Sequence, residues 1–280
     1  MPSHRSTPSA SLAPSCRRSR RVAMRTLAAA FIVPALPLSA QVRMALATAI
    51  NRTARFRALS QRAAKAYGQL HLGVVPERAR DVLGHTRKQV LAGFEEMDGQ
   101  AWPPEVARQL QDVRRSADRL DALLGQAPSK EGFAAVSAQS DQMMAAAHAA
   151  TEALEKLAQA PTARLVNTAG RQRMLSQRLA KNYELMAAGL DGRAVREQMA
   201  GDAEEFQRAL AQLAKAPIST PAIRQALEQG QAQWVFFDAA LKRQPDARGL
   251  DNVATTSERL LELMDSLTAL YEVALRDVLG

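Results

Sequence analysis

A segment of eighteen residues occurs twice in this sequence of 280 residues, and this repeat constrains the fold more than any other feature. Residues 50–67 read INRTARFRALSQRAAKAY, and residues 166–183 read VNTAGRQRMLSQRLAKNY. The two stretches lie 116 residues apart and share ten of their eighteen residues, far more than chance gives at one offset. Repetition at a long fixed spacing indicates a duplicated unit, so we expect the second half of the chain to fold like the first.

The repeat continues to the end of each half, now at an offset of 117 residues, so one residue has been inserted in between. Small and apolar residues recur there at alternating spacings of four and three, which predicts a long helix with one buried seam. The residues of the two seams are Val136, Ser140, Met143, Ala147, Ala150, Leu154 and Leu157, and Val253, Ser257, Leu260, Met264, Leu267, Tyr271 and Ala274.

Prolines, glycines and capping residues divide each half into four helices. In the first half the boundaries are set by Pro76, Pro103-Pro104, Gly125 and Pro128-Ser129. In the second half Gly189 ends the repeated helix, Asp191 caps the next one, Thr220-Pro221 begin the third, and Gly249 precedes the last. No segment shows the alternation of a strand.

The predicted fold is therefore all-α, with eight helices in two tandem up-and-down four-helix bundles after an N-terminal signal segment. We expect the first repeat to span residues 44–160 and the second residues 162–280. Short connections make consecutive helices antiparallel neighbours.

The first forty residues are predicted to form a signal peptide. They carry six arginines and no acid, and a positive stretch precedes an apolar run from Leu27 to Leu38. Cleavage after Ala40 gives an exported, periplasmic protein, and cleavage after Ala47 is an alternative. An uncleaved anchor in the inner membrane is the other alternative. Whether translation starts at Met1 or Met24, and whether export uses the general or the twin-arginine route, stays open.

The remaining residues exclude several classes of function. Without the leader, 31 basic and 28 acidic residues give a charge of +3, which offers no case for nucleic-acid binding. Cys16 is the sole cysteine and lies in the leader, so disulfides, thiolate metal ligands and a cysteine nucleophile are excluded from the mature chain. His71, His85 and His148 lack metal-ligand spacing. We expect no enzyme, no metal and no cofactor.

One face of the second repeated helix carries Val166, Gly170, Arg173, Gln177 and Ala180, all at helical spacing. A glycine within a helix allows close backbone approach. Two such faces, paired about a two-fold axis, would bring two arginines together, and an oxyanion between them would relieve their repulsion. The alternatives are that the arginines lie on a solvated face, or that the repeat preserves packing alone.

The segment VNTAGRQRMLSQRLAKNY resembles the opening helix of the PilJ-type domain, the N-terminal domain of type IV pili methyl-accepting chemotaxis transducers. It is also similar to the ligand-binding segment of NarX-type nitrate/nitrite sensor kinases, with the pattern Ile-Asn-x-Ala-Gly-x-x-Arg-Met-x-Ser-x-Arg-Leu. That resemblance implies nitrate binding at a dimer interface, through Arg173 and the backbone near Gly170.

The first copy departs from the pattern, because Ala54 replaces the glycine, although Arg57 aligns with Arg173. The candidate anion-binding residues are Arg173, Gly170, Arg57, Asn167 and Asn51, brought together in an intrachain pseudo-dimer or in a homodimer.

The resemblance implies an exported module that binds a small oxyanion such as nitrate or nitrite. The sequence carries no signalling module, so we expect it to act through a separate partner: a membrane receptor, a sensor kinase or a pilus-related protein. The alternative is a structural or protein-interaction module of a type IV pilus or chemosensory system, with no small-molecule ligand.

Overall fold

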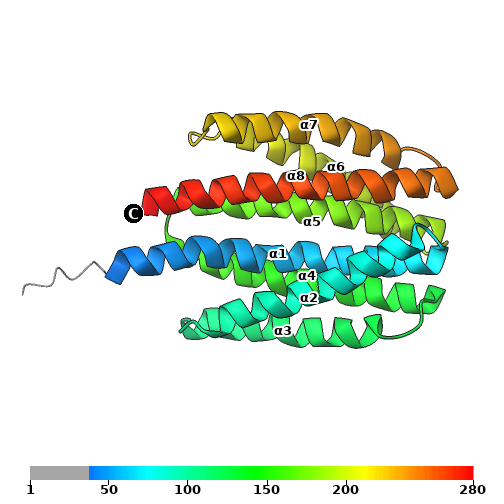
Figure 1. Ribbon diagram of the computed structural model, residues 1–280, viewed down its shortest axis with the longest axis horizontal. Coiled ribbons are helices and arrows are strands. Elements are labelled where there is room, and N and C mark those ends of the chain that lie inside the picture. Colours follow the sequence, from blue (N-terminus) through cyan, green and yellow to red (C-terminus); the bar gives the residue numbers. More distant parts are fainter. Residues whose placement is uncertain (1–37, 280) are drawn as a thin grey trace, which may run out of the picture. The chain divides into compact units, whose positions relative to one another are not determined.

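The computed structural model describes residues 38–279, which form eight helices and, within that range, no strand (Figure 1). The helices are α1 (Leu38–Leu72), α2 (Pro76–Asp98), α3 (Pro104–Leu124), α4 (Lys130–Ala158), α5 (Pro161–Ala187), α6 (Arg193–Ala214), α7 (Pro221–Leu241) and α8 (Ala247–Leu279). The all-α prediction is confirmed. The predicted signal peptide falls largely on residues 1–37, outside the described residues.

Most predicted helix boundaries are confirmed, because the residues at them act locally. Prolines occupy the first turn of α2, α3, α5 and α7, where the missing N–H costs no hydrogen bond. The Ser129 hydroxyl accepts a hydrogen bond from the Gly132 N–H at 2.9 Å and caps α4. The Thr220 hydroxyl caps α7 in the same way, accepting from the Ile223 N–H at 3.2 Å.

Two predicted boundaries are wrong. Asp191 does not cap α6: Gly192 holds that position, and the Asp191 carboxylate pairs with Arg196 instead. Gly249 lies inside the first turn of α8 rather than before it, because the Asp246 carboxylate accepts from the Gly249 N–H at 2.7 Å and starts the helix earlier.

A glycine is needed at position 249 for packing instead, because a side chain there would clash with its surroundings. A Cβ at this position would clash with the main-chain oxygen of Gln244 and with the Tyr183 hydroxyl. A Cβ on the equivalent Gly132 of α4 would clash with the hydroxyl of Tyr67. Each tyrosine donates to the connection before the last helix of its half, to the carbonyl oxygens of Ala127 and Gln244.

The repeated helices α1 and α5 lie side by side at the centre, flanked by α4 and α8, while α2 with α3 and α6 with α7 lie outermost (Figure 1). The described residues form one compact unit, and one apolar core contains residues of both halves. The motif helices therefore pair within one chain. The division into two domains stays a prediction. Two further pairs of equivalent residues in the repeat, Leu59 with Leu175 and Ala64 with Ala180, are buried in the core.

Candidate functional site

The site begins where α1 crosses α5, because the same position of the repeat meets its own counterpart there. A Cβ built on Gly170 would lie 3.1 Å from the Cβ of Ala54, which is tighter than ordinary contact. It would also lie 3.1 Å from Nη2 of Arg173 and 3.5 Å from Nη2 of Arg57. The two guanidinium groups thus converge on this crossing, and the missing Cβ gives them room.

The structure brings all five predicted site residues together, in a reciprocal arrangement. Arg57 Nη2 donates to the main-chain oxygen of Asn167 at 3.2 Å. Arg173 Nη2 donates to the main-chain oxygen of Asn51 at 3.3 Å and to its Oδ1 at 2.8 Å. Both arginines are buried, so the alternative of a solvated face is wrong. Such mutual contacts between equivalent residues are typical of an interface with two-fold symmetry.

The two asparagines extend this symmetry to the ends of the long helices. Asn51 Nδ2 donates to the Glu272 carboxylate at 2.5 Å, and Asn167 Nδ2 donates to that of Glu155 at 2.5 Å. Glu155 and Glu272 are 117 residues apart, the offset between α4 and α8. Each asparagine therefore joins its own helix to the last helix of the other half.

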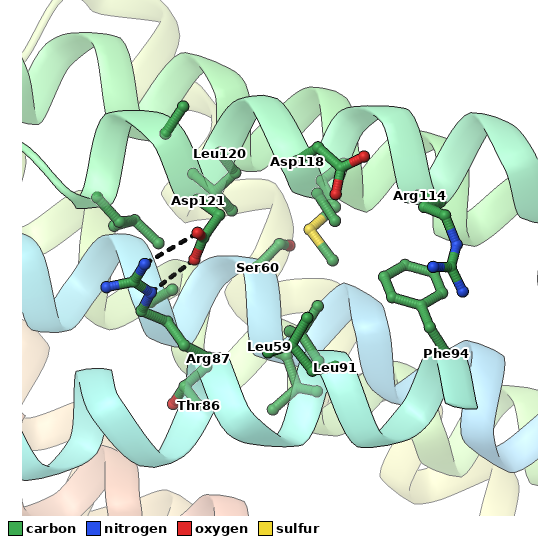
Figure 2. Close-up of a pocket in the computed structure, with 16 residues that line it drawn as sticks. Leu59, Ser60, Thr86, Arg87, Leu91, Phe94, Arg114, Asp118, Leu120 and Asp121 are labelled. Atoms are coloured by element: carbon green, nitrogen blue, oxygen red, sulfur yellow. Dashed lines mark hydrogen bonds and ion pairs between the residues drawn. The ribbon is translucent and has the colours of Figure 1, made fainter. Parts of the chain in front are cut away.

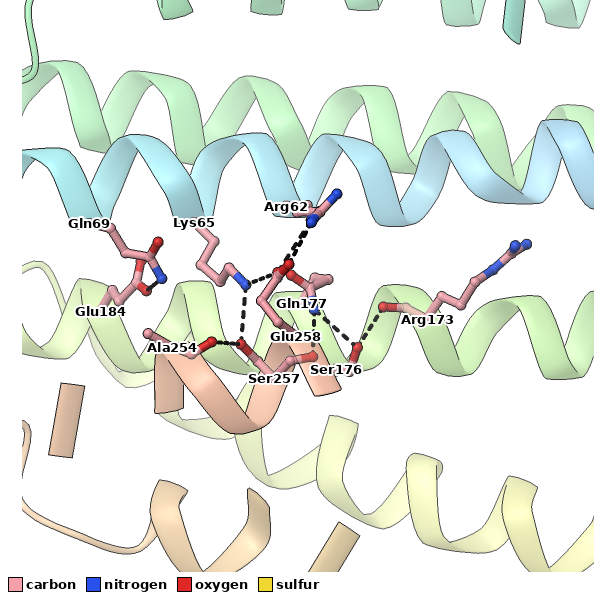
Figure 3. A network of polar contacts seen from close by, with 10 residues as sticks. All are labelled: Arg62, Lys65, Gln69, Arg173, Ser176, Gln177, Glu184, Ala254, Ser257 and Glu258. Carbon is pink, nitrogen blue, oxygen red and sulfur yellow. Dashed lines mark hydrogen bonds and ion pairs between the residues drawn. The ribbon is translucent and has the colours of Figure 1, made fainter. Parts of the chain in front are cut away.

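Two buried lysines join the halves further along the repeated helices, and Figure 3 shows the contacts of the first, Lys65. Lys65 donates to the Glu258 carboxylate at 2.5 Å and to the Ser257 hydroxyl at 3.1 Å. Its counterpart Lys181 donates to Asp141, at the position equivalent to Glu258, at 2.8 Å. Burial lowers the pKa of both lysines, and the partner carboxylates act in the opposite direction.

The two halves differ in the side chains that contact the two arginines. The Asp265 carboxylate accepts from Arg173 Nη1 at 2.6 Å and from Arg55 at 2.5 Å. The equivalent position 117 residues earlier is His148, whose Nδ1 lies 3.3 Å from Arg57 Nη1. Because a guanidinium only donates, the imidazole must accept through this nitrogen. Arg173 has a carboxylate partner, and Arg57 has a histidine in its place.

The charges follow from this difference. Burial, together with the positive charges of Arg171 and Arg173, lowers the pKa of Arg57 to about 9. Burial and the charge of Arg57 also lower the pKa of His148, so the imidazole is neutral near pH 7 and adds no counter-charge. The carboxylates of Glu152 and Glu155 raise the pKa of Arg57, but among the described residues no ion pair joins Arg57 to an acid. Arg57 is therefore a buried cation, and the carboxylates that partly compensate its charge form no ion pair with it.

A cleft of about 200 Å³ lies next to this position, lined by His148, Asn167, Gln172, Arg171, Arg208 and their neighbours. Arg171 pairs with Glu205, its Nη2 donating at 3.0 Å. Arg173 Nε is buried without an acceptor. The guanidinium groups that line the cleft are those of Arg171 and Arg208, while the buried Arg57 lies behind His148 and Asn167, to which it donates. Planar guanidinium groups suit the geometry of carboxylate-like and nitrate-like oxyanions.

In the part of the chain that the structure describes, no three histidine, aspartate, glutamate or cysteine side chains lie close enough together to hold a metal ion. None of the helices between residues 38 and 279 has the length and hydropathy needed to cross a membrane.

Comparison with known families finds a match in the second half of the chain. Residues 157–260 match the PilJ family model, that of the N-terminal part of type IV pili methyl-accepting chemotaxis transducers. This confirms the PilJ resemblance. The match covers α5, α6 and α7 and part of α8, so the PilJ segment contains Arg173, Gly170 and Asn167. No curated protein and no solved structure matches the chain.

By its description, the matched family is one of chemotaxis transducers, which are sensory proteins. That the first half is a second PilJ copy stays a prediction, as does the similarity to nitrate/nitrite sensor kinases. The equivalent contacts of Asn51 and Asn167, and of Lys65 and Lys181, support duplication.

Sequence reasoning missed Asp265 and His148, the residues that distinguish the two arginines. Their signal was present in the register of the last helices, because the offset of 117 residues that aligns Ser140 with Ser257 also aligns His148 with Asp265. Which side chain faces which arginine, however, depends on packing between helices about 90 residues apart in sequence.

Proposed function

We propose that this chain is an exported sensory module that binds a small planar oxyanion, such as nitrate or nitrite, at the buried Arg57. The observation that carries the proposal is the pairing of equivalent arginines with unlike partners, Asp265 beside Arg173 and His148 beside Arg57. A buried charge needs compensation by a partner of opposite sign. In the second half the protein supplies that partner, and in the first half an anion from solution takes its place.

The remaining site residues then have distinct roles. Gly170 leaves space for both guanidinium groups at the helix crossing. Asn51 and Asn167 offer their main-chain oxygens to the arginines and hold them in position across the interface. Arg173 contributes its unpaired Nε and its positive charge, although Asp265 already occupies another side of its guanidinium.

A bound anion would couple the two halves, because its ligands come from both α1 and α5. A change in their packing would be passed on to a separate protein, for which the PilJ resemblance favours a membrane receptor, a sensor kinase or a pilus-related component. The module is proposed to reside in the periplasm after cleavage of its signal peptide.

The alternative function, a structural or interaction module without a ligand, is favoured by one specific observation. Arg57 and Arg173 already donate to the main chain of the opposite half, so both serve the packing of α1 on α5. On this alternative, anions leave the protein unchanged, and the arginines that occur in both repeats serve their structural contacts alone.

Calorimetric titration with nitrate and nitrite separates the two functions, with chloride as the spherical control anion. The key variant is His148→Asp, which copies the second half by placing a carboxylate beside Arg57. We expect saturable binding to the unaltered protein and at least a tenfold weaker affinity in His148→Asp. Absence of binding to the unaltered protein favours the structural alternative, and unchanged binding to His148→Asp places any anion site elsewhere.

A further inference from the structure

A cavity of about 310 Å³ opens between α2 and α3 and reaches inward to α1 and α4 (Figure 2). Its walls are mainly apolar and include Leu59, Leu91 and Phe94. Protein interiors are close-packed, and an unfilled cavity of this size lowers stability. Pockets that bind small molecules, by contrast, have this volume and this largely apolar lining.

In the second half larger side chains occupy the inner part of the same space. Three of the smaller residues of the cavity wall have larger counterparts there: Ala63 corresponds to Leu179, Val90 to Phe206, and Ala117 to Trp234. Phe206 and Trp234 stack with their ring centroids 4.3 Å apart. A groove of about 420 Å³ remains between α6 and α7, but it is lined by residues of those two helices only, Trp234 among them, and does not reach α5 or α8.

A fourth difference leaves a polar group without a partner at the cavity. In the second half Asp202 of α6 forms a buried ion pair with Arg178 of α5, with distances of 2.7 and 2.5 Å. The first half has Thr86 at the position of Asp202, and Arg62, the counterpart of Arg178, pairs with Glu258 of α8 instead. Thr86 is one of the residues that line the cavity, and its hydroxyl is buried in the wall without a hydrogen-bond partner.

The charges at the mouth identify the kind of ligand. Arg87 is engaged with Asp121, with distances of 2.6 and 2.9 Å, at one end of the cavity, as Figure 2 shows. Arg114, at the other end beside Phe94, pairs with Asp98 at 2.6 Å. The remaining carboxylate of Asp118 disfavours an anion. The cavity thus offers no cation to a negatively charged molecule.

We propose that this cavity binds an uncharged, mainly apolar molecule of about the size of a two-ring aromatic compound, with one hydroxyl or carbonyl group directed to Thr86. The size follows from the volume, which is roughly twice the ~150 Å³ cavity known to take up benzene. The buried threonine hydroxyl selects a ligand with one polar group, because leaving a buried polar group unpaired is unfavourable. The inference is independent of the proposed anion site.

Calorimetric titration of the full chain with 2-naphthol tests this inference, with 2-naphthoate as a charged ligand of the same ring system. We expect one saturable site for 2-naphthol and at least tenfold weaker binding of 2-naphthoate. Failure of 2-naphthol to bind overturns the proposal, and equal binding of the two compounds overturns the assignment of an uncharged ligand.

Two variants locate the site. Ala117→Trp copies Trp234 into the cavity and should weaken 2-naphthol binding at least tenfold, while the matched control Ala134→Trp, at an exposed position of α4, leaves it unchanged. If thermal melting shows that Ala117→Trp does not fold, the smaller substitution Ala63→Leu, which copies Leu179, is used to test whether filling the cavity weakens binding. Binding that persists in the folded cavity variant, or that is lost equally in the control, contradicts the inference. His148→Asp should retain 2-naphthol binding.

Discussion

Ala54 of α1 and Gly170 of α5 face each other at the crossing of the two repeated helices, although they are the same position of the repeat. Only one of them is glycine, and one missing Cβ is enough to bring the helices together and to leave space for both guanidinium groups. Gly170 therefore belongs to the shared interface rather than to the second half alone.

Replacing Gly170 by leucine should lower the free energy of unfolding by about 1–3 kcal/mol, the usual cost of overpacking an interior. The added side chain would meet Ala54 and both arginines. Gly201 is the matched control, because it is an exposed glycine within α6 with open space around it. Gly201→Leu should raise stability by roughly 0.5–1 kcal/mol through helix propensity. Equal effects in denaturant unfolding would refute the close crossing.

Glu258 should make the fold sensitive to acid. Burial raises the pKa of this carboxyl, but Lys65 and Arg62 outweigh burial and lower the pKa to about 2 from the usual 4.5. A lowered pKa contributes stability that is fully present above about pH 4.5 and is lost as the pH falls toward 2. Denaturant unfolding of the unaltered protein between pH 6 and 2 should show this decline.

Glu258→Gln separates this contribution from that of other acids. The variant leaves Lys65 buried without a counter-charge, so we expect a loss of about 3–5 kcal/mol at pH 7. The difference between variant and unaltered protein should shrink as the pH falls below 4.5. A difference that stays constant with pH would show that Glu258 is not the titrating group.

Glu184 should act in the opposite direction. Burial raises its pKa well above 4.5, although the charge of Lys65 and a hydrogen bond from Gln69 at 3.0 Å oppose this. A raised pKa gives stability that is present below about pH 4.5 and is lost as the pH rises. Glu184→Gln keeps an acceptor for Gln69 and cannot ionise.

Glu184→Gln should therefore raise the melting temperature at pH 7 and have little effect near pH 4. The measurement is thermal unfolding of both proteins at the two pH values. A variant that is less stable at pH 7 would mean that the ionised carboxylate is required there, as a partner of Lys65.

Much of the fold could be predicted because its signals are local. Pro76, Gly125 and Thr220-Pro221 mark helix ends by their own backbone and capping chemistry. Gly249 misled because a Cβ there would clash with the main-chain oxygen of Gln244 and with the Tyr183 hydroxyl, and neither contact is visible in the sequence.

The site was predictable only in part. The repeat identified Arg57 and Arg173 as equivalent, and pairing about a two-fold axis predicted that they would meet. The partners of the lysines could not be predicted, because Lys65 reaches Glu258 and Lys181 reaches Asp141 only after the halves have packed. The cavity beside Thr86 likewise depends on the partner of Arg62. Its side chain pairs with Glu258 of α8 rather than with a residue of α2, and the sequence does not reveal which of the two helices it contacts.

The central claim is that Arg57 is a buried cation without the carboxylate that Asp265 provides to Arg173. The melting temperature of His148→Asp, measured without oxyanions and again with nitrate or nitrite, tests it most directly. Without oxyanions the variant should be the more stable protein, by on the order of 1.5 kcal/mol for a new hydrogen bond between charged groups. The oxyanion should then raise the melting temperature of the unaltered protein and leave that of the variant unchanged. A variant that melts lower than the unaltered protein without oxyanions would contradict the account, since Arg57 would then be fully compensated by the partners it already has.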